Sequence, residues 1–482
     1  MNTPAADTKT TSSYKDNVAI TASPSEGTAD KSRSDAPVAV LPNSKLVRLC
    51  GSTWFNVIAV GFVSFTQPGI WNALASMGAG GQQEPYVVNA ASALTFGLMI
   101  FGCSIFGGLA SKLGLRTILI IGTLGYAPYS AALYCNSRYG TQWFIFLGAI
   151  TCGISASALF ASEGAIAVGY LLVKERGLAT GVWLGLRQFG QLIGAAVQLS
   201  MNIDNAERGY VGYGTYLALI GIQCAGLPLA FLVSSPGKAI RSDGTIVGKD
   251  TEKREVLAEF KKMWTLLKKP QIYLMVRVLV TFIWNSTYQS IYLTAYFSVR
   301  ARTLASLTSA IGMILGDLFW GRFLDTKLLG TRTTAKLTWI FFSAMMVSLF
   351  GWQFANEHLY ANTTPTPTFD WVTPGFGRAF TVNLLFAIMN ESHYIFVYWL
   401  LGHFDKDVET LSLTVGLMRT FESLGATLAF AAGSAQTTPM VQLIISFVMF
   451  AVAIPPTMMV TWLVPEDIEK DESEESSEVV EA

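Results

Sequence analysis

The chain has 482 residues, of which 51% are hydrophobic and only 14% are charged, and its formal net charge at pH 7 is zero. Soluble domains carry about 25% charged residues, so this composition excludes an ordinary soluble protein and indicates an integral membrane protein. The chain also lacks a basic cluster interleaved with aromatic residues, so no nucleic-acid partner is expected.

Residues 1–45 are polar and lack the apolar segment of a cleaved secretory signal, so we expect a disordered cytoplasmic tail. Twelve apolar runs follow, each close to the roughly 20 residues that one membrane crossing needs. The predicted helices are 47–77, 87–109, 117–135, 143–168, 178–201 and 213–233 in an N-terminal half (46–234), and 272–297, 304–324, 337–355, 376–401, 411–435 and 440–463 in a C-terminal half (271–464). The predicted fold class is an all-α integral membrane protein with twelve transmembrane helices in two six-helix, pseudo-symmetric halves.

Residues 235–270 join the halves and contain no hydrophobic run, but they hold a dense cluster of Lys and Arg. Because basic loops favour the cytoplasmic side, we expect a cytoplasmic hinge loop here, with an amphipathic surface helix over 250–267. The final segment, 465–482, is acidic and rich in Ser, which is typical of a solvated cytoplasmic tail.

The basic residues also predict the orientation of the helices. The inner loops and the hinge carry about 18 Lys and Arg, against about five in the outer loops, namely Arg138, Arg208, Arg300, Arg302 and Arg378. Both termini are therefore expected in the cytoplasm, in the plasma membrane or an endomembrane. In the longest outer loop, Asn362-Thr363-Thr364 matches the acceptor pattern for N-glycosylation, which fits a lumenal or extracellular position.

Three pairs of segments repeat between the halves in the same order. GGLASKLGLRT (107–117) matches GRFLDTKLLGTRT (321–333), and LGLRQFGQLIGA (184–195) matches VGLMRTFESLGA (415–426). Glu163 and Glu391 both follow a Leu-Phe-Ala sequence. Small residues are common where membrane helices meet, so each match alone is weak, but their shared order supports two parallel repeats.

Residues 107–116 resemble the signature of the major facilitator superfamily, which runs Gly-x-Leu-Ala-Asp-Arg/Lys-x-Gly-x-Arg between helices 2 and 3. The end of helix 1, PGIWNALASMGAGG (68–81), together with NAASAL (89–94), is similar more narrowly to the uncoordinated-ninety-three-like branch. The resemblance extends over most of 45–465 and implies the major facilitator fold.

The sequence departs from the superfamily signature at Ser111, which stands where the usual acid is found. The second half keeps an acid, Asp325, with two extra residues before Gly330. The branch is described as transporter-like in fold, and its better-known animal members are spoken of as channel-regulating or receptor-trafficking proteins. Fold carries over between relatives better than activity does.

Polar residues at matching positions of helices 1 and 7 are the candidate substrate-binding residues: Gln67, Trp71 and Asn72, and Asn285, Tyr288 and Gln289. Pro68 lies beside the first group, and a proline within a membrane helix frees backbone groups that can line a cavity. The alternative is a helix kink and an interfacial belt of aromatic residues.

Ionisable residues inside the predicted helices form a second candidate group, and each costs about 2.5–3.5 kcal/mol at a helix centre, so such residues usually face the bundle interior and pair. Proton coupling or charge pairing is expected of Glu163, Arg187, Asp317, Glu391, His393 and Arg419, while Arg277 and Glu422 also lie within helices. Residue depth predicts that Glu163 meets Arg187 and that Glu391 meets Arg419.

The sequence argues against an enzyme. It has no Ser-His-Asp, Cys-His or metal-spaced cluster, so no catalytic residue, cofactor or metal site is expected. The run Gly78-Ala79-Gly80-Gly81 lacks the Lys-Ser/Thr of a phosphate-binding loop, and a turn with Gly at positive φ explains it.

Two functions remain. One is a transporter that moves a small solute through the lipid bilayer by rocking of its two halves, coupled to protons through the intramembrane acids or His393. The other is a non-transporting membrane protein that keeps the fold and regulates or escorts a membrane-protein partner. Ser111 favours the second function and the polar residues of helices 1 and 7 favour the first.

Overall fold

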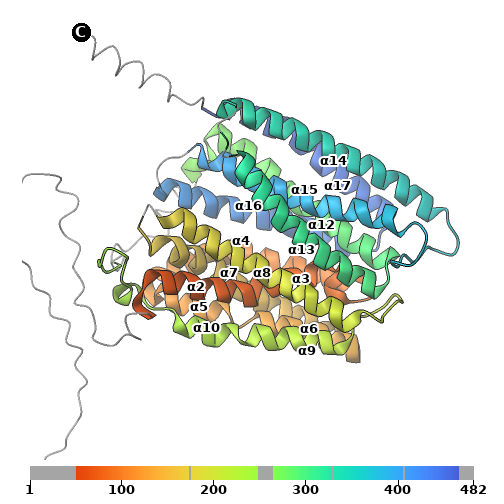
Figure 1. Cartoon of the computed structure of the whole chain (residues 1–482), viewed down its shortest axis with the longest axis horizontal. Helices are drawn as coiled ribbons and strands as arrows, with labels where there is room; N and C mark the ends of the chain where they lie inside the picture. The colour runs from red at the N-terminus through yellow and green to blue at the C-terminus, as the bar shows by residue number, and fades with distance from the viewer. Residues whose placement is uncertain are drawn as a thin grey trace, which may run out of the picture.

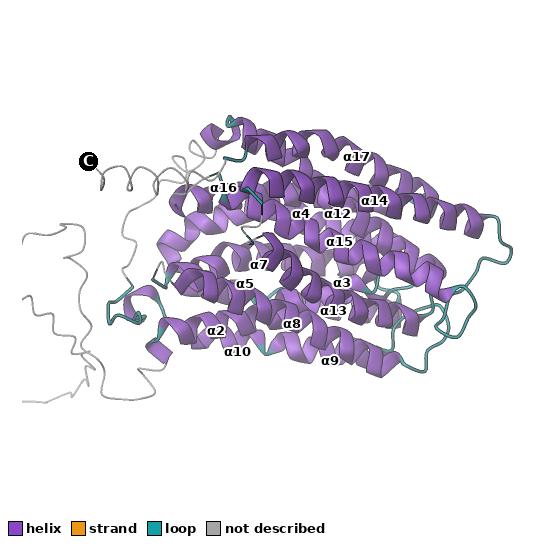
Figure 2. Cartoon of the chain, turned by 45° about the horizontal axis from the view of Figure 1, so that its top comes forward, coloured by secondary structure: helices purple, strands orange, loops and turns teal. Residues whose placement is uncertain are grey.

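The structure is a computed structural model that describes residues 50–172, 175–247, 264–324, 326, 329–404 and 408–465. Over these ranges the chain is built of helices that run side by side in one elongated bundle (Figure 1), joined by loops without a regular strand (Figure 2). The described chain begins and ends at the same end of the bundle, opposite the loop between α14 and α15 (Figure 1).

The first half contains six helical rods, three of them broken. They are α2 (Thr53–Ser64), η1 (Phe65–Gly69) and α3 (Ile70–Ser76) in one rod, α4 (Pro85–Leu113), α5 (Leu115–Gly122) with α6 (Tyr126–Tyr139), α7 (Gln142–Gly169), α8 (Arg176–Asn202), and α9 (Tyr213–Cys224) with α10 (Gly226–Leu232). The first rod is broken where Pro68 lacks a backbone donor, and five residues there form a π-helical turn.

The second half contains six unbroken helices: α12 (Pro270–Tyr296), α13 (Val299–Leu324), α14 (Thr331–Ala361), α15 (Phe376–Gly402), α16 (Val408–Ser434) and α17 (Pro439–Leu463). The prediction placed the ends of α14 at 337 and 355 and was too short at both ends. The missed C-terminal turns are polar, but Asn356 and Glu357 are buried against neighbouring helices, so the helix continues past its apolar run.

Among the described residues, nine rods are long and apolar enough to cross a membrane. The other three, α8, α12 and α16, have 27 residues each, or about 40 Å at 1.5 Å per residue, which also suffices to cross. They are less apolar because they carry much of the bundle's internal polar surface, including Gln188, Asn285 and Glu422.

Each half has its own hydrophobic core. One cluster includes Val60, Leu119 and Tyr216, and the other is an aromatic core around Trp339 and Phe342. The halves pack chiefly through α4 against α16 and α8 against α13. Counted in chain order, α4 and α16 are rods 2 and 11, and α8 and α13 are rods 5 and 8. If each rod n of the first half is exchanged with rod n+6 of the second half, the contact of α4 with α16 becomes the contact of α13 with α8. The packing therefore has the two-fold pseudo-symmetry that the sequence repeats predict.

The glycine-rich turn after α3 takes the predicted conformation. Gly78, Gly80 and Gly81 all have positive φ, and so does Ala79. A Cβ at Gly78 would lie 2.9 Å from the carbonyl oxygen of Ser290 in the other half, so this turn permits a close approach of the halves. The predicted surface helix over 250–267 lies mostly outside the described residues, as do both tails.

Candidate functional site

Ionisable side chains from both halves gather where α7 and α8 face α13, α15 and α16. We call this group the charged layer: Glu163, Arg187, Asp317, Glu391, Arg419 and Glu422. Glu163 on α7 is 1% exposed and accepts a hydrogen bond of 2.6 Å from the Ser64 hydroxyl, which itself accepts one from the Trp183 indole at 2.9 Å. Its second carboxylate oxygen has no hydrogen-bond partner among the described residues.

Both guanidinium groups of the layer lie close to one aromatic ring, that of Phe160. The Arg187 guanidinium lies 5.2 Å from the centre of the Phe160 ring, and that of Arg419, from the other half, lies 5.3 Å from the same ring. Cation–π attraction of this kind favours both positions. One residue of the first half therefore contacts a cation from each half.

Carboxylates of the second half complete the layer. Glu391 on α15 accepts a hydrogen bond of 3.1 Å from the Gln188 amide on α8, which joins the halves directly. Asp317 on α13 lies within electrostatic range of Glu391. Glu422 forms an ion pair with Arg419 at 3.0 Å and accepts a hydrogen bond from the Tyr394 hydroxyl at 3.1 Å.

The predicted charge pairs share the layer but do not form direct ion pairs in the described structure. Arg187 interacts with Glu163 through space and stacks on Phe160. Arg419 takes Glu422, three residues along its own helix, as its partner, because residues at that spacing lie on one helix face. The roles expected of these residues in proton coupling stay a prediction.

The predicted substrate-binding residues of helix 1 have different surroundings. Gln67 is fully buried and donates a hydrogen bond of 2.7 Å to the Gln223 carbonyl, so it packs inside its own half. Trp71 lies edge-on against Phe96, which stacks on Phe430 of the other half. Asn72 is half-buried. Among these three, Trp71 is the one whose contacts lead across the boundary between halves.

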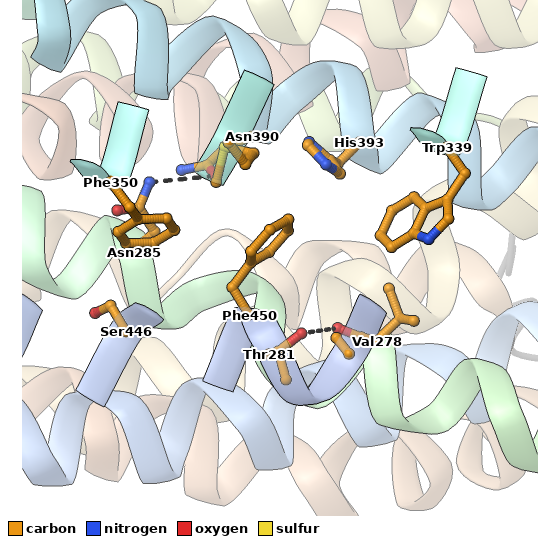
Figure 3. Close-up of a pocket in the computed structure, with 11 residues that line it drawn as sticks. Val278, Thr281, Asn285, Trp339, Phe350, Asn390, His393, Ser446 and Phe450 are labelled. Carbon is orange, nitrogen blue, oxygen red and sulfur yellow. Dashed lines mark hydrogen bonds between the residues drawn. The ribbon is translucent and has the colours of Figure 1, made fainter. Parts of the chain in front are cut away.

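The helix 7 candidates mostly hold α12 to its neighbours. The Tyr288 hydroxyl donates to the buried carboxylate of Glu357 at 2.6 Å, and Gln289 donates to the Asn383 carbonyl at 3.4 Å. Asn285 donates to the Asn390 side chain at 3.4 Å and lines a small cavity inside the second half (Figure 3). His393 lines the same cavity.

Sequence reasoning missed the contacts that close one end of the bundle, which we call the sealed end: the turn 77–82, the loop 203–212, and the start of α13. Arg302 is 1% exposed and donates hydrogen bonds to four main-chain carbonyls of the first half: Met77 (2.9 Å), Gly78 (2.7 Å), Gln82 (3.1 Å) and Gly209 (3.2 Å). The prediction counted Arg302, with Arg300 and Arg378, among the bases of outer loops, but Arg300 and Arg302 lie in the first turn of α13 and Arg378 lies in that of α15.

Further bonds join the halves at the sealed end. The hydroxyl groups of Ser76 and Ser306 lie 2.6 Å apart, and the Ala79 amide donates to the Ser290 hydroxyl at 2.8 Å. The Val299 amide donates to the Glu207 carbonyl at 2.8 Å. Like those of Arg302, these contacts are hydrogen bonds without covalent links.

Two six-helix halves that enclose charged residues and are held together at one end by hydrogen bonds define a membrane protein of the transporter type. The family model of the Major Facilitator Superfamily matches residues 49–394. An UNC93-like protein of Schizosaccharomyces pombe is 26% identical over 393 residues, covering 79% of this chain and 76% of the relative. The chain belongs to the major facilitator superfamily, in its UNC93-like branch.

Two further similarities were found. The notoamide biosynthesis cluster protein O' of Aspergillus versicolor is 33% identical over 416 residues, covering 86% of this chain and 89% of the relative. The fold also matches the crystal structure of a D-xylose-proton symporter, with a TM-score of 0.58 at 13% identity over 85% of this chain and 97% of that one. The last similarity concerns the fold alone.

Proposed function

We propose that this protein moves a small solute across a membrane by alternating access, in which the two halves rock about the charged layer. The observation that carries the proposal is that both halves contribute buried charges to one layer. Each such charge costs about 2.5–3.5 kcal/mol at the centre of a membrane helix. In a purely structural protein these charges would lower the stability of the fold without any gain in function.

The sealed end supports a conformational cycle. Its polar contacts between the halves are hydrogen bonds without covalent links, and the single residue Arg302 makes four of them, so the halves can part there by exchanging these bonds for bonds to water. Polar contacts of this kind exchange with water at a modest net cost of about 0.5–1.5 kcal/mol each, or about 1.5–3 kcal/mol for charged groups.

We further propose proton coupling, because the charged layer is unbalanced. It holds four carboxylates (Glu163, Asp317, Glu391 and Glu422) against two guanidinium groups (Arg187 and Arg419). An excess of negative charge in a low-dielectric interior favours protonation of some carboxyl groups. Movement of the halves changes the surroundings of these groups and hence their proton affinity.

The rival function, regulation or escort of a membrane-protein partner, rests on Ser111 in place of the signature acid. Metabolite profiling distinguishes the two in cells that make the wild-type chain, Glu391→Gln, or neither, with equal amounts of each protein in the membrane. We expect at least one solute whose distribution depends on the wild-type chain and shifts less with the variant. Unchanged metabolites together with a co-purifying membrane protein would favour the rival.

A further inference from the structure

A small cavity with a mainly apolar lining and a few polar groups lies inside the second half (Figure 3). Residues of α12, α14, α15 and α17 line it. Its volume is about 30 Å³. One water needs about 10–15 Å³, so the cavity has room for about two or three waters and is too small for a metabolite.

The histidine in the cavity has a fixed tautomer. The Nδ1 atom of His393 lies 2.5 Å from the carbonyl oxygen of Met389. A carbonyl only accepts hydrogen bonds, so Nδ1 carries the proton and Nε2 of the neutral ring presents a lone pair. The side chain is 4% exposed, and Nε2 has no hydrogen-bond partner in the described structure. An unsatisfied buried acceptor of this kind is destabilising.

A second acceptor in the same cavity is also unsatisfied. Asn285 is 5% exposed, and its amide nitrogen donates to Asn390, while its Oδ1 has no partner among the described residues. The hydroxyl groups that line the cavity cannot help, because Thr281 donates to the Val278 carbonyl at 2.7 Å and Ser446 donates to a main-chain carbonyl, that of Gln442 at 2.9 Å or that of Trp284 at 3.0 Å. The lining hydroxyl groups therefore donate elsewhere and supply no hydrogen bond to His393 Nε2 or Asn285 Oδ1.

We propose that this cavity is a water-binding site, in which bound water donates hydrogen bonds to His393 Nε2 and Asn285 Oδ1. Water has the required size and supplies the missing donors. An ion is a poorer occupant, because the ten lining residues other than His393 are uncharged: Val278, Thr281, Asn285, Trp339, Met346, Phe350, Asn390, Ser446, Phe450 and Ala453.

The bound water is the hydrogen-bond partner that the described residues do not supply to Nε2 of His393. The ring is otherwise enclosed by Trp339, Phe342 and Phe450, with centroid distances of 5.7, 4.6 and 5.9 Å, and none of these titrates. A water at Nε2 donates a hydrogen bond to the lone pair of the neutral ring, so the buried acceptor is satisfied without a change in the charge of the site. This site goes beyond the proposed transport, because it exists whether or not a solute moves.

Solid-state NMR on the full chain in liposomes, with ¹⁵N-labelled histidine, tests the proposal. The chain has three histidines, and His393→Asn identifies the signal of His393 by its loss. At neutral pH we expect the Nδ1–H tautomer and a magnetisation-transfer peak between Nε2 and water protons. A protonated Nε2 in the neutral ring, or an Nε2 without contact to water, would overturn the proposal.

A cavity variant locates the water. Asn285→Leu keeps the side-chain size but removes the polar partner, so the water peak of His393 should fall at least severalfold. Ser446→Ala is the matched control, because it removes a hydroxyl whose proton is used elsewhere, and the peak should stay. An unchanged peak in Asn285→Leu would contradict the site. If that variant does not fold, the tautomer and water contact of the wild-type chain still decide the question.

Discussion

Arg302 of the second half donates a hydrogen bond of 2.7 Å to the carbonyl oxygen of Gly78 in the first half. The bond is possible because Gly78 has a φ of 80°, which turns the chain after α3 and brings several carbonyl groups towards one point. A planar guanidinium with five donors suits such a cluster of acceptors better than an ammonium group does. Arg302 is thus the main polar link between the halves at the sealed end.

Arg302→Met should open the sealed end more often. Loss of hydrogen bonds from a charged donor, each about 1.5–3 kcal/mol, is expected to raise the open fraction about tenfold or more. A cysteine introduced at Ser290, in a chain without its native cysteines, should then react about tenfold faster with a membrane-impermeant maleimide. Arg378→Met is the control, since Arg378 bonds Asn356 within its own half. Equal rates in the two variants would show that Arg302 does not hold this end closed.

The sequence predicted the helices and their division into halves because apolar runs are a local property. It also placed Glu163, Glu391 and Arg419 within helices, but it missed the buried Glu357, which lies in the part of α14 beyond the predicted end. It did not predict their partners, because partner choice depends on how each helix is rotated and on what the opposite half supplies. Arg302 illustrates this limit, since an arginine close to the start of α13 has the sequence appearance of an exposed loop base and is buried only by the other half.

Ser76 and Ser306 offer a way to lock the halves. Their hydroxyl oxygens are 2.6 Å apart, so a Ser76→Cys/Ser306→Cys chain without its native cysteines should form a disulfide on mild oxidation. After cleavage at a protease site inserted in the hinge, the halves should stay joined on a non-reducing gel and separate on reduction. The pair Gln67→Cys/Ser306→Cys should not cross-link, because Gln67 packs inside its own half. Failure of the first pair would contradict the closed contact.

Asn362 tests the predicted orientation. It is exposed just after α14, at the end of the bundle opposite the two ends of the described chain. If the termini are cytoplasmic, Asn362 should carry a glycan in a eukaryotic host, and treatment with peptide N-glycosidase should shift the wild-type band but not that of Asn362→Gln. A tag on residue 1 that is protected from protease in intact cells would agree. Digestion of the tag from outside would show that the orientation is the opposite of the predicted one.

Asp370, in the loop before α15, should stabilise the fold over an unusually wide pH range. The hydrogen-bonded Arg300 guanidinium, at 2.7 Å, lowers the pKa of this carboxyl to about 2. Since the folded value lies below the unfolded one of about 3.9, the stabilisation is present above about pH 4 and is lost only as pH falls towards about 2. The melting temperature of the wild-type chain should therefore exceed that of Asp370→Asn by the same margin at pH 7 and at pH 5. A margin that shrinks between these values would contradict the pairing.

The charged layer contains two pairs of one Glu and one Arg, and only one of these pairs forms a direct ion pair. The stability of variants of the two pairs can therefore be compared. Arg419 and Glu422 touch at 3.0 Å, with side chains 30% and 12% exposed, whereas Glu163 and Arg187 interact only through space. Removing one member of a buried ion pair leaves the other as an uncompensated buried charge, which costs about 3–5 kcal/mol of folding free energy. Partial exposure of the pair to solvent makes this cost smaller. Arg419→Gln and Glu422→Gln should each lower the melting temperature.

The double variant Arg419→Gln/Glu422→Gln should recover much of that loss, which gives a large coupling in a double-mutant cycle. Glu163→Gln and Arg187→Gln should be nearly additive, because the amide oxygen introduced by Glu163→Gln can still accept the Ser64 hydrogen bond and Arg187 rests on Phe160. Thermal unfolding of the six variants in one detergent measures both couplings. A Glu163–Arg187 coupling as large as that of Arg419 with Glu422 would mean that Glu163 and Arg187 form a direct ion pair in the dominant conformation. That result would contradict the arrangement of the charged layer described above.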